Sequence, residues 1–412
     1  MKFAVAVHGT RGDVEPCAAV ALELRRRGHE VRMAAPPNML GFVESVGLQA
    51  VAYGPDSAAQ LEEDTFHSAV RLRNPISALH EGMEYMTRGW AEMSATLASL
   101  AEGVDLILHD QTYQGVAVNV AEYHDVPLAA LHHFPHRVNG QLLPFLPSPL
   151  VRFGMTVGDW GYWRLTKPAE DAQRRALGLP KTAVSSVRRM ERSALEIQTY
   201  EELFFPGLAA EWNERRPFVG VLTLELPTAN DDEVMSWIAS GTPPIYFGFG
   251  SMPIESLTDT IRMISEACAQ LGERALICAG TNESDDLPRQ DHLKVVRAVN
   301  HAAVFPICRA VVHHGGAGTT AAAMRAGVPM VVLPIGAEQP IWANQVKRLR
   351  VGVARRFSSA TLQSLAADLR TILTPHYGAR AREIASQMTK PEVSVARTAD
   401  LLEREVAARR AA

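Results

Sequence analysis

The residues best suited to chemistry form a glycine-rich turn in the second half of the chain, His314-Gly-Gly-Ala-Gly-Thr-Thr320. A buried strand is predicted to end just before this turn, and a helix to begin near Thr319. The first amides of a helix have no internal partners and lie at its positive end, so such a turn favours a bound anion. His314 adds a side-chain donor, and Thr319 can cap the helix or bond a phosphate oxygen. The turn therefore predicts an anion site, with a tight turn around a satisfied histidine as the alternative.

Three polar side chains in the same half could support this site. Ser251 follows Phe247-Gly-Phe-Gly at the end of another predicted strand, and Glu338 and Gln339 follow a strand at Met330–Leu333. Open α/β sheets hold their ligands at the carboxyl edge of the strands, where these residues are expected to lie. A carboxylate and an amide can bond several hydroxyls, as a sugar requires. Taken singly, each residue could equally be a solvated loop residue.

The elements that position these residues alternate between short apolar strands and helices. A first helix is predicted over Pro16–Arg27, with Gly28 ending it in the left-handed conformation. Asp13 would then N-cap that helix from a preceding loop. Strand, helix, strand at this spacing implies parallel sheets with right-handed crossovers, hence an α/β fold in two successive halves. The predicted strands are Lys2–His8, Glu30–Ala35, Asp105–His109, Leu128–Leu131, Ile245–Phe249, Ala275–Ala279, Val295–Ala298, Ala310–His313 and Met330–Leu333.

Less regular stretches separate these strands. The segment Gln60–Leu100 is predicted to be a mostly helical insertion, and Val138–Lys167 an irregular apolar stretch suited to a pocket wall or to packing under a loop. Pro217, Pro227 and the acidic run from Asn230 to Glu233 indicate a linker between the two halves. Asp110 and His133 each follow a predicted strand, where they would contact a ligand or pack internally.

Composition narrows the class of protein. A chain of 412 residues is too long for one ordinary hydrophobic core, which indicates two domains. A composition of 47% hydrophobic and 21% charged residues is typical of a globular protein. A formal charge of −4 argues against nucleic acid as the main partner. No signal peptide or long apolar run is evident, so we expect a cytoplasmic protein. One segment is rich in basic residues: Arg174, Arg175, Lys181, Arg188, Arg189 and Arg192. It is expected to be either a solvated helical face or a patch that binds anionic lipids. In the second case the protein would be peripheral at the inner face of the membrane.

The glycine-rich turn, Ser251 and the Glu338-Gln339 pair resemble the second half of family 1 glycosyltransferases of GT-B fold. The opening His8-Gly-Thr-Arg-Gly-Asp13-Val-Glu-Pro16, with Gly28-His29-Glu30-Val31, is similar to the signature of their bacterial antibiotic and sterol branch. The narrower likeness is to mycobacterial glycopeptidolipid glycosyltransferases. This resemblance implies two Rossmann-like α/β/α domains facing across a cleft, with the C-terminal helix packing back on the first. The implied domains are 1–210 for the acceptor, 211–380 for the nucleotide sugar, and closing helices at 381–412.

The resemblance also implies a role for each matching residue. His314 and the amides of Gly316, Ala317, Gly318 and Thr319 would bind the diphosphate. Ser251 would contact phosphate or ribose, and backbone groups of Val299 would hold the base. Glu338 and Gln339 would bind sugar hydroxyls. Thr10 and Arg11 would contact the donor phosphates, although Arg11 could equally be an exposed loop arginine. Asp13 matches the bacterial catalytic carboxylate. Plant members have Trp and Pro-Gln around the base, where this chain has Val299-Asn300-His301. The nucleoside of the donor could therefore be uridine, thymidine or guanosine.

The implied reaction is a single displacement that inverts the anomeric carbon. Asp13 removes the acceptor proton while the helix start and His314 stabilise the leaving diphosphate. The chain contains no Asp-x-Asp, and Asp231-Asp232 and Asp285-Asp286 fall in predicted solvated loops, so no metal or other cofactor is expected. Aromatic residues in the two less regular stretches favour a lipophilic acceptor, which Asp110 and His133 would contact. The nearest likeness suggests a deoxysugar donor such as rhamnose or 6-deoxytalose.

Two other functions fit parts of the sequence. A non-catalytic glycosyltransferase-like partner would be expected to lose the phosphate-site residues, which this chain retains. A sugar-nucleotide epimerase explains the second half but not the opening signature. A nicotinamide-dependent dehydrogenase is excluded because no GxGxxG follows the first strand.

Overall fold

The computed structural model describes residues 1–60, 83–84, 86–143, 145–213, 215–228, 231–250, 256–280, 290–336 and 338–411. They form two compact units, Met1–Thr223 with Thr389–Ala412, and Leu224–Met388. The chain leaves the first unit later than the predicted 210, because Val219 N–H donates to the Gln198 carbonyl at 3.0 Å beside the sheet. It returns later than the predicted 380, where Thr389 Oγ1 donates to Glu201 at 2.8 Å.

The first unit is built on a six-stranded parallel sheet with the order β3-β2-β1-β4-β5-β6. The order reverses between β1 and β4, and open α/β sheets hold their ligands at the carboxyl edge beside such a reversal. The predicted strands are confirmed, with ends shifted by up to two residues. Their bounds are β1 Lys2–Ala6, β2 Glu30–Ala35, β3 Ala50–Ala52, β4 Leu106–His109, β5 Leu128–His132 and β6 Ala194–Gln198.

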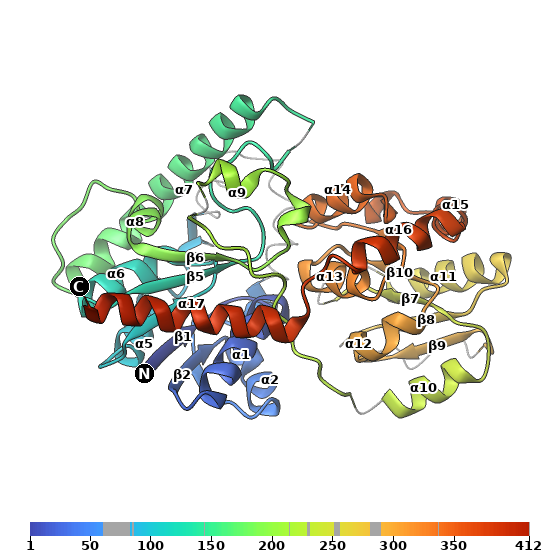
Figure 1. Ribbon diagram of the computed structural model, residues 1–412, viewed down its shortest axis with the longest axis horizontal. Helices are drawn as coiled ribbons and strands as arrows, with labels where there is room; N and C mark the ends of the chain where they lie inside the picture. The colour runs from blue at the N-terminus through green and yellow to red at the C-terminus, as the bar shows by residue number, and fades with distance from the viewer. Residues whose placement is uncertain are drawn as a thin grey trace. The chain divides into compact units, whose positions relative to one another are not determined.

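Helices cover this sheet (Figure 1), and two sequence predictions about them are wrong. The first helix begins at Arg11, not Pro16, because Thr10 and Asp13 form a capping box that starts it earlier. The stretch from Ser148 is one long helix rather than irregular chain, initiated by prolines that cannot donate to a preceding turn. The helices are α1 Arg11–Arg26, α2 Leu40–Ser45, α5 Trp90–Leu100, α6 Gln114–His124, α7 Ser148–Ala176, α8 Ser186–Ser193 and α9 Leu208–Glu211, with 3-10 turns η1 Pro37–Met39 and η2 Glu202–Phe204. Residues 61–82 and 85 of the predicted insertion Gln60–Leu100 lie outside the described residues.

The basic segment at the end of α7 is neither uniformly solvated nor uniformly available to lipid. Arg174 is buried and pairs with Glu122 at 2.7 Å. Arg189 pairs with Glu122 at 3.0 Å and with buried Glu170 at 3.4 Å. These two guanidiniums therefore tie α6, α7 and α8 together.

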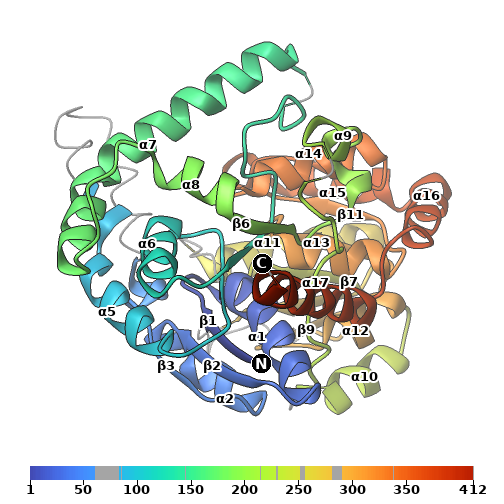
Figure 2. The same ribbon diagram turned by 60° about the vertical axis from the view of Figure 1, so that its left-hand side comes forward.

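The C-terminal helix α17 (Pro391–Ala411) packs back on the first unit, as predicted (Figure 2). It lies along α1, where Arg27 contacts Asp400 and Glu403 at 2.7 Å each. His29 adds a contact of 2.6 Å to Glu403. Partial burial of this network makes it more than a set of exposed surface pairs.

The second unit repeats the same plan, with a parallel sheet in the order β12-β11-β10-β7-β8-β9 that reverses between β10 and β7. Its strands are β7 Ile245–Gly248, β8 Ala275–Cys278, β9 Leu293–Val296, β10 Ala310–His313, β11 Met330–Val332 and β12 Gly352–Ala354. Its helices are α10 Asp231–Ala239, α11 Leu257–Leu271, α12 His301–Val304, α13 Ala317–Arg325, α14 Gln339–Leu349, α15 Leu362–Ile372 and α16 Pro375–Ala385, with 3-10 turns η3 Phe305–Ile307 and η4 Phe357–Ser359.

The acidic run predicted as a linker instead begins α10. Asp231 accepts hydrogen bonds from Thr228 N–H at 2.7 Å and from Asn300 N–H at 3.1 Å. These bonds hold the pKa of Asp231 below its usual value despite partial burial. Asp231 is therefore a structural carboxylate and not part of a solvated loop.

Candidate functional site

In the first unit, the loops after β1 and β4 meet where the strand order reverses. The Thr112 hydroxyl donates to the His8 carbonyl at 2.8 Å, which ties the two loops together. The His8 ring is buried, and its Nε2 lies 3.0 Å from the Pro55 carbonyl. Burial lowers the pKa of His8, so this histidine is neutral at physiological pH. The bond from Thr112 to its carbonyl and the contact of its ring with Pro55 fix the position of His8.

Asp13 lies at the third position of α1, with its side chain folded back over the helix start. Its Oδ2 accepts a hydrogen bond from Thr10 N–H at 2.9 Å. A Cβ on Gly9 (φ +151°) would lie 2.3 Å from that oxygen, so only glycine fits beside the carboxylate. The predicted N-cap to a helix at Pro16 is thus wrong in detail, because Asp13 caps α1 from within its first turn. The carboxylate is half-buried at the carboxyl edge of the sheet.

The other candidates of the first unit differ in accessibility. Asp110 is fully buried, and its Oδ2 accepts from Thr112 at 2.9 Å. His133 is buried with its Nδ1 2.8 Å from Thr199, while its Nε2 has no hydrogen-bond partner in the described chain. Arg11 contacts Glu15 at 3.0 Å and stacks on the Phe42 ring, so its guanidinium already has partners within α1 and α2.

The two carboxylates act on a common neighbour, the Cys17 thiol. Burial raises the pKa of Cys17 well above its usual value, and the charges of Asp110 and Asp13 raise it further. Asp13 lies in the first turn of the helix that follows β1, and Asp110 directly follows β4, so both residues lie at the edge where the sheet order reverses. A pair of carboxylates in such a place can accept a proton or hold a hydroxyl.

In the second unit, His314 lies between the loops after β7 and β10. A Cβ on Gly250 (φ +64°) would approach the His314 ring to 2.8 Å, and one on Gly316 would approach its Nε2 to 2.6 Å. Glycines on both sides are therefore required for the ring to occupy this position. The glycines at the end of β7 are evident in the sequence, but the packing of Gly250 against His314 could not be predicted from it.

The helix after this turn begins slightly earlier than predicted. Gly316 is the N-cap of α13, and Thr319 lies within its first turn, so Thr319 does not cap the helix, and its other predicted role, a bond to a phosphate oxygen, stays a prediction. The amides of Gly316, Ala317, Gly318 and Thr319 donate to no group in the described residues. Four free N–H groups at a helix start form a concave anion site.

His314 reaches this site as a neutral ring. Burial lowers its pKa to about 4, so at neutral pH the imidazole carries no charge. In the absence of ligand, the positive potential therefore comes from the helix end, and His314 offers a hydrogen bond. An anion bound beside the ring would raise its pKa again.

The Glu338-Gln339 pair adjoins the glycine turn. A Cβ on Gly315 (φ +97°) would lie 3.1 Å from the Gln339 carbonyl oxygen, which shows how closely the two loops pack. Gln339 is buried, and its Oε1 accepts from Ile335 N–H at 2.8 Å and Gly336 N–H at 3.2 Å. Only its amide nitrogen can then serve a ligand. Burial also raises the pKa of Glu338.

Val299 and Ser251 complete the predicted donor residues. Val299 is buried in the loop after β9, and its backbone groups make no hydrogen bond within the described ranges. Its neighbour Asn300 caps α12 by accepting from Ala302 N–H at 3.0 Å. Ser251 lies outside the described residues.

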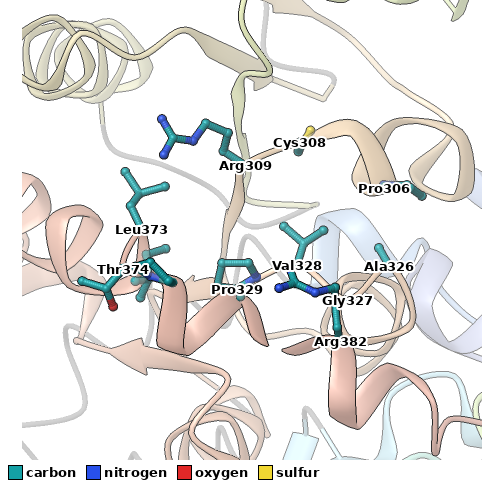
Figure 3. Close-up of a pocket in the computed structure, with 13 residues that line it drawn as sticks. Pro306, Cys308, Arg309, Ala326, Gly327, Val328, Pro329, Leu373, Thr374 and Arg382 are labelled. Carbon is teal, nitrogen blue, oxygen red and sulfur yellow. The ribbon is translucent and has the colours of Figure 1, made fainter. Parts of the chain in front are cut away.

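A separate pocket of about 360 Å³ lies in the second unit, lined by Arg309, Val328, Pro329, Thr374 and Arg382 among others (Figure 3). Arg309 and Pro329 directly precede β10 and β11, so this pocket lies at the amino ends of these strands. The glycine turn follows the carboxyl end of β10. This pocket is therefore at the opposite edge of the sheet from the anion site and is not part of it.

Buried histidines give the fold a predicted sensitivity to acid. Burial lowers the pKa of His133 to about 4, against 6.5 for the free side chain. The neutral ring contributes fully to the free energy of unfolding above pH 6.5, and this contribution is lost as the pH falls towards 4. The loss amounts to about 2 kcal/mol at pH 5. We expect His133→Asn, which can retain the bond to Thr199, to lose less stability than the wild type between pH 7.5 and 5. Urea unfolding at both pH values measures this, and identical losses would contradict it.

Two segments of the chain match known families. Residues 3–120 match the glycosyltransferase family 28 N-terminal domain, and residues 255–403 match the erythromycin biosynthesis protein CIII-like, C-terminal domain. An uncharacterised glycosyltransferase of Mycobacterium tuberculosis is 63% identical over 100% of both chains. A sterol 3-beta-glucosyltransferase of Arabidopsis thaliana is 27% identical over 98% of this chain and 68% of its own. The crystal structure of the glycosyltransferase VinC in complex with dTDP aligns with a TM-score of 0.64 at 18% identity, over 98% of this chain and 99% of that one.

Two parallel-sheet units, each with polar loops where its strand order reverses, define the GT-B class of fold. The chain belongs to the family 1-type glycosyltransferases of this fold. It is therefore a glycosyltransferase, and the resemblance found in the sequence is confirmed. None of the helices in the described ranges combines the length and apolarity needed to cross a bilayer.

Proposed function

We propose that the protein transfers a hexosyl unit, with inversion, from a nucleoside diphosphate sugar to a hydroxyl of a lipophilic acceptor. The observation that carries this proposal is the anion site of the second unit. Four amides with no partner among the described residues lie beside the neutral His314 ring at the start of α13. They match the charge and the hydrogen-bonding needs of a diphosphate.

The proposed reaction assigns the proton and the leaving group to different units. Asp13 takes the proton of the acceptor hydroxyl as its oxygen forms a bond to the anomeric carbon. The bond from that carbon to the diphosphate oxygen breaks, and its electron pair leaves with the diphosphate. The helix-start amides stabilise the charge that grows on this oxygen.

The finer choice of donor and acceptor rests on the relatives and on apolar side chains. VinC was crystallised with dTDP, and the free backbone groups of Val299 suit a base held through main-chain hydrogen bonds. We propose a thymidine or uridine diphosphate donor carrying a deoxysugar. The sterol 3-beta-glucosyltransferase among the relatives supports a lipophilic acceptor such as a glycopeptidolipid or another lipid. Asp110 and His133 would contact it.

A panel of nucleotide sugars, screened by thermal shift and then by product analysis with lipid acceptors, tests this function. A ligand present at a hundred times its dissociation constant stabilises its domain by about 2.7 kcal/mol, enough for a measurable shift. A shift with at least one nucleotide sugar, followed by transfer, is the expected result. A shift followed by conversion of the donor sugar without any acceptor would indicate an epimerase instead.

We also propose that transfer needs no metal ion, because the α13 helix end supplies the positive potential. Activity is expected to persist unchanged in excess EDTA. The control is the same assay with added Mg²⁺, which should give no more than a small change. Complete loss in EDTA, with recovery on adding Mg²⁺, would contradict this prediction and leave the donor site itself intact.

A further inference from the structure

The start of α7 carries an unusual concentration of exposed apolar side chains. Ten large apolar side chains are exposed in the described residues, and six of them lie between positions 145 and 160. The exposed fraction is 70% for Phe145, 66% for Phe153 and 61% for Trp160. Scattered exposed apolar residues are ordinary, whereas a contiguous set marks a surface that meets something other than water.

Four of these side chains form one face of the helix, which we call the α7 stripe: Leu150, Phe153, Val157 and Trp160. At 100° per residue, they span an arc of about 80°. The buried residues Val151 and Thr166 lie on the opposite side of the helix, against the unit. The stripe therefore points away from the core, so internal packing does not explain it.

Charge is scarce beside the stripe. Between Gln141 and Trp163 the only charged residues are Arg152 and Asp159. Arg152 is neutralised by Glu211 at 2.7 Å, and Asp159 lies on the half-buried side of the helix. Glycines at 154, 158 and 161 have open space above them, so nothing in their surroundings requires the absence of a side chain.

Exposed cations follow the stripe along the chain. Arg164 is one turn beyond Trp160 on the same face, and α8, which packs on α7, adds Arg188 and Arg192. Five cations in this region make no ion pair within the described part of the chain: Arg164, Arg175, Lys181, Arg188 and Arg192. The other two arginines of this region form ion pairs, Arg174 with Glu122 and Arg189 with Glu122 and Glu170.

We propose that the α7 stripe and these five cations dock the protein on an anionic lipid surface. Phenylalanine and tryptophan insert at the boundary between headgroups and acyl chains, and arginine and lysine bind the anionic headgroups. The cations select this occupant over a second copy of the chain, because two like sets of unpaired positive charge would repel each other. The surface would hold the protein where a lipophilic acceptor resides, although docking does not depend on transfer.

Vesicle flotation of the full chain, without nucleotide or acceptor, tests this surface. Vesicles are made of phosphatidylcholine alone or mixed with an equal amount of phosphatidylglycerol. We expect binding to the mixed vesicles, weakened by salt and lowered about tenfold by the double variant Phe153→Ser, Trp160→Ser. Arg188→Glu with Arg192→Glu should weaken binding to the mixed vesicles only.

Tyr123→Ser is the matched control, because Tyr123 is 49% exposed on α6 and lies outside the stripe. It should bind vesicles like the wild type. Equal binding of wild type and stripe variant, or no binding by the wild type, would overturn the proposal. So would a dimer in light scattering that the stripe variant converts to monomer. Thermal shift by nucleotide sugars on the same variants should not change, which separates this proposal from the proposed function.

Discussion

Replacing Asp13 by asparagine is expected to abolish sugar transfer while the fold and nucleotide binding persist. The asparagine oxygen can still accept the hydrogen bond from Thr10 N–H that Asp13 accepts at 2.9 Å, so the start of α1 is preserved. The amide cannot take a proton from the acceptor. Losing a general base typically lowers turnover by 10² to 10⁴-fold, so we expect kcat to fall about a thousandfold.

Two further variants separate catalysis from capping. Asp13→Ala removes the capping bond as well, and should cost about 1 kcal/mol of stability in addition to activity. Glu15→Gln changes a nearby carboxylate of α1 that contacts Arg11 and Thr223, and it should keep most of the activity. Calorimetry with UDP and TDP measures nucleotide binding by all three. Turnover by Asp13→Asn at the wild-type rate would place the base elsewhere in the protein.

The edge strands β3, β6 and β12 were not predicted from the sequence, whereas the other nine of the twelve strands in the described residues were, because buried parallel strands are short apolar runs between polar loops. Ala310–His313 and Glu30–Ala35 were predicted with correct bounds for that reason. The start of α1 was misplaced because Pro16 resembles a first-turn proline, whereas the Thr10–Asp13 capping box lies upstream of it. Pro16 is instead accommodated inside the helix.

Local sequence patterns could not predict which polar side chains are buried or which residues they contact. Gln339 is a polar residue in a loop-like context, yet two backbone amides occupy its Oε1. Arg174 and Arg189 belong to a basic run, but Glu122 is more than fifty residues away in sequence and reaches them only in the fold. The apolar residues of Val138–Lys167 were consistent with either a pocket wall or packing under a loop, because composition does not reveal which side of a helix faces the core.

Replacing His314 by alanine is expected to weaken nucleotide binding and turnover while the second unit stays folded. A hydrogen bond to a charged group contributes about 1.5–3 kcal/mol, so affinity should fall roughly tenfold to a hundredfold. The ring also fills the space between Gly250 and Gly316, and its loss leaves the loops after β7 and β10 less well supported. His133→Asn is the matched control, because it changes a buried histidine of the first unit and should leave affinity unaltered.

The pH dependence of binding distinguishes a phosphate contact from simple support of the loops. The pKa of unliganded His314 is about 4, and a bound diphosphate raises it by favouring the charged ring. Binding then tightens as the pH falls through the raised pKa of the complex, because the complex takes up a proton that the free protein does not hold. Titration of the diphosphate itself contributes equally to wild type and His314→Ala, so the difference between them isolates the histidine. Calorimetry with UDP and TDP from pH 8 to pH 5.5 should show that difference growing towards acid. Parallel curves would mean that His314 supports the loops without touching phosphate, and equal affinities would remove the diphosphate from this turn altogether.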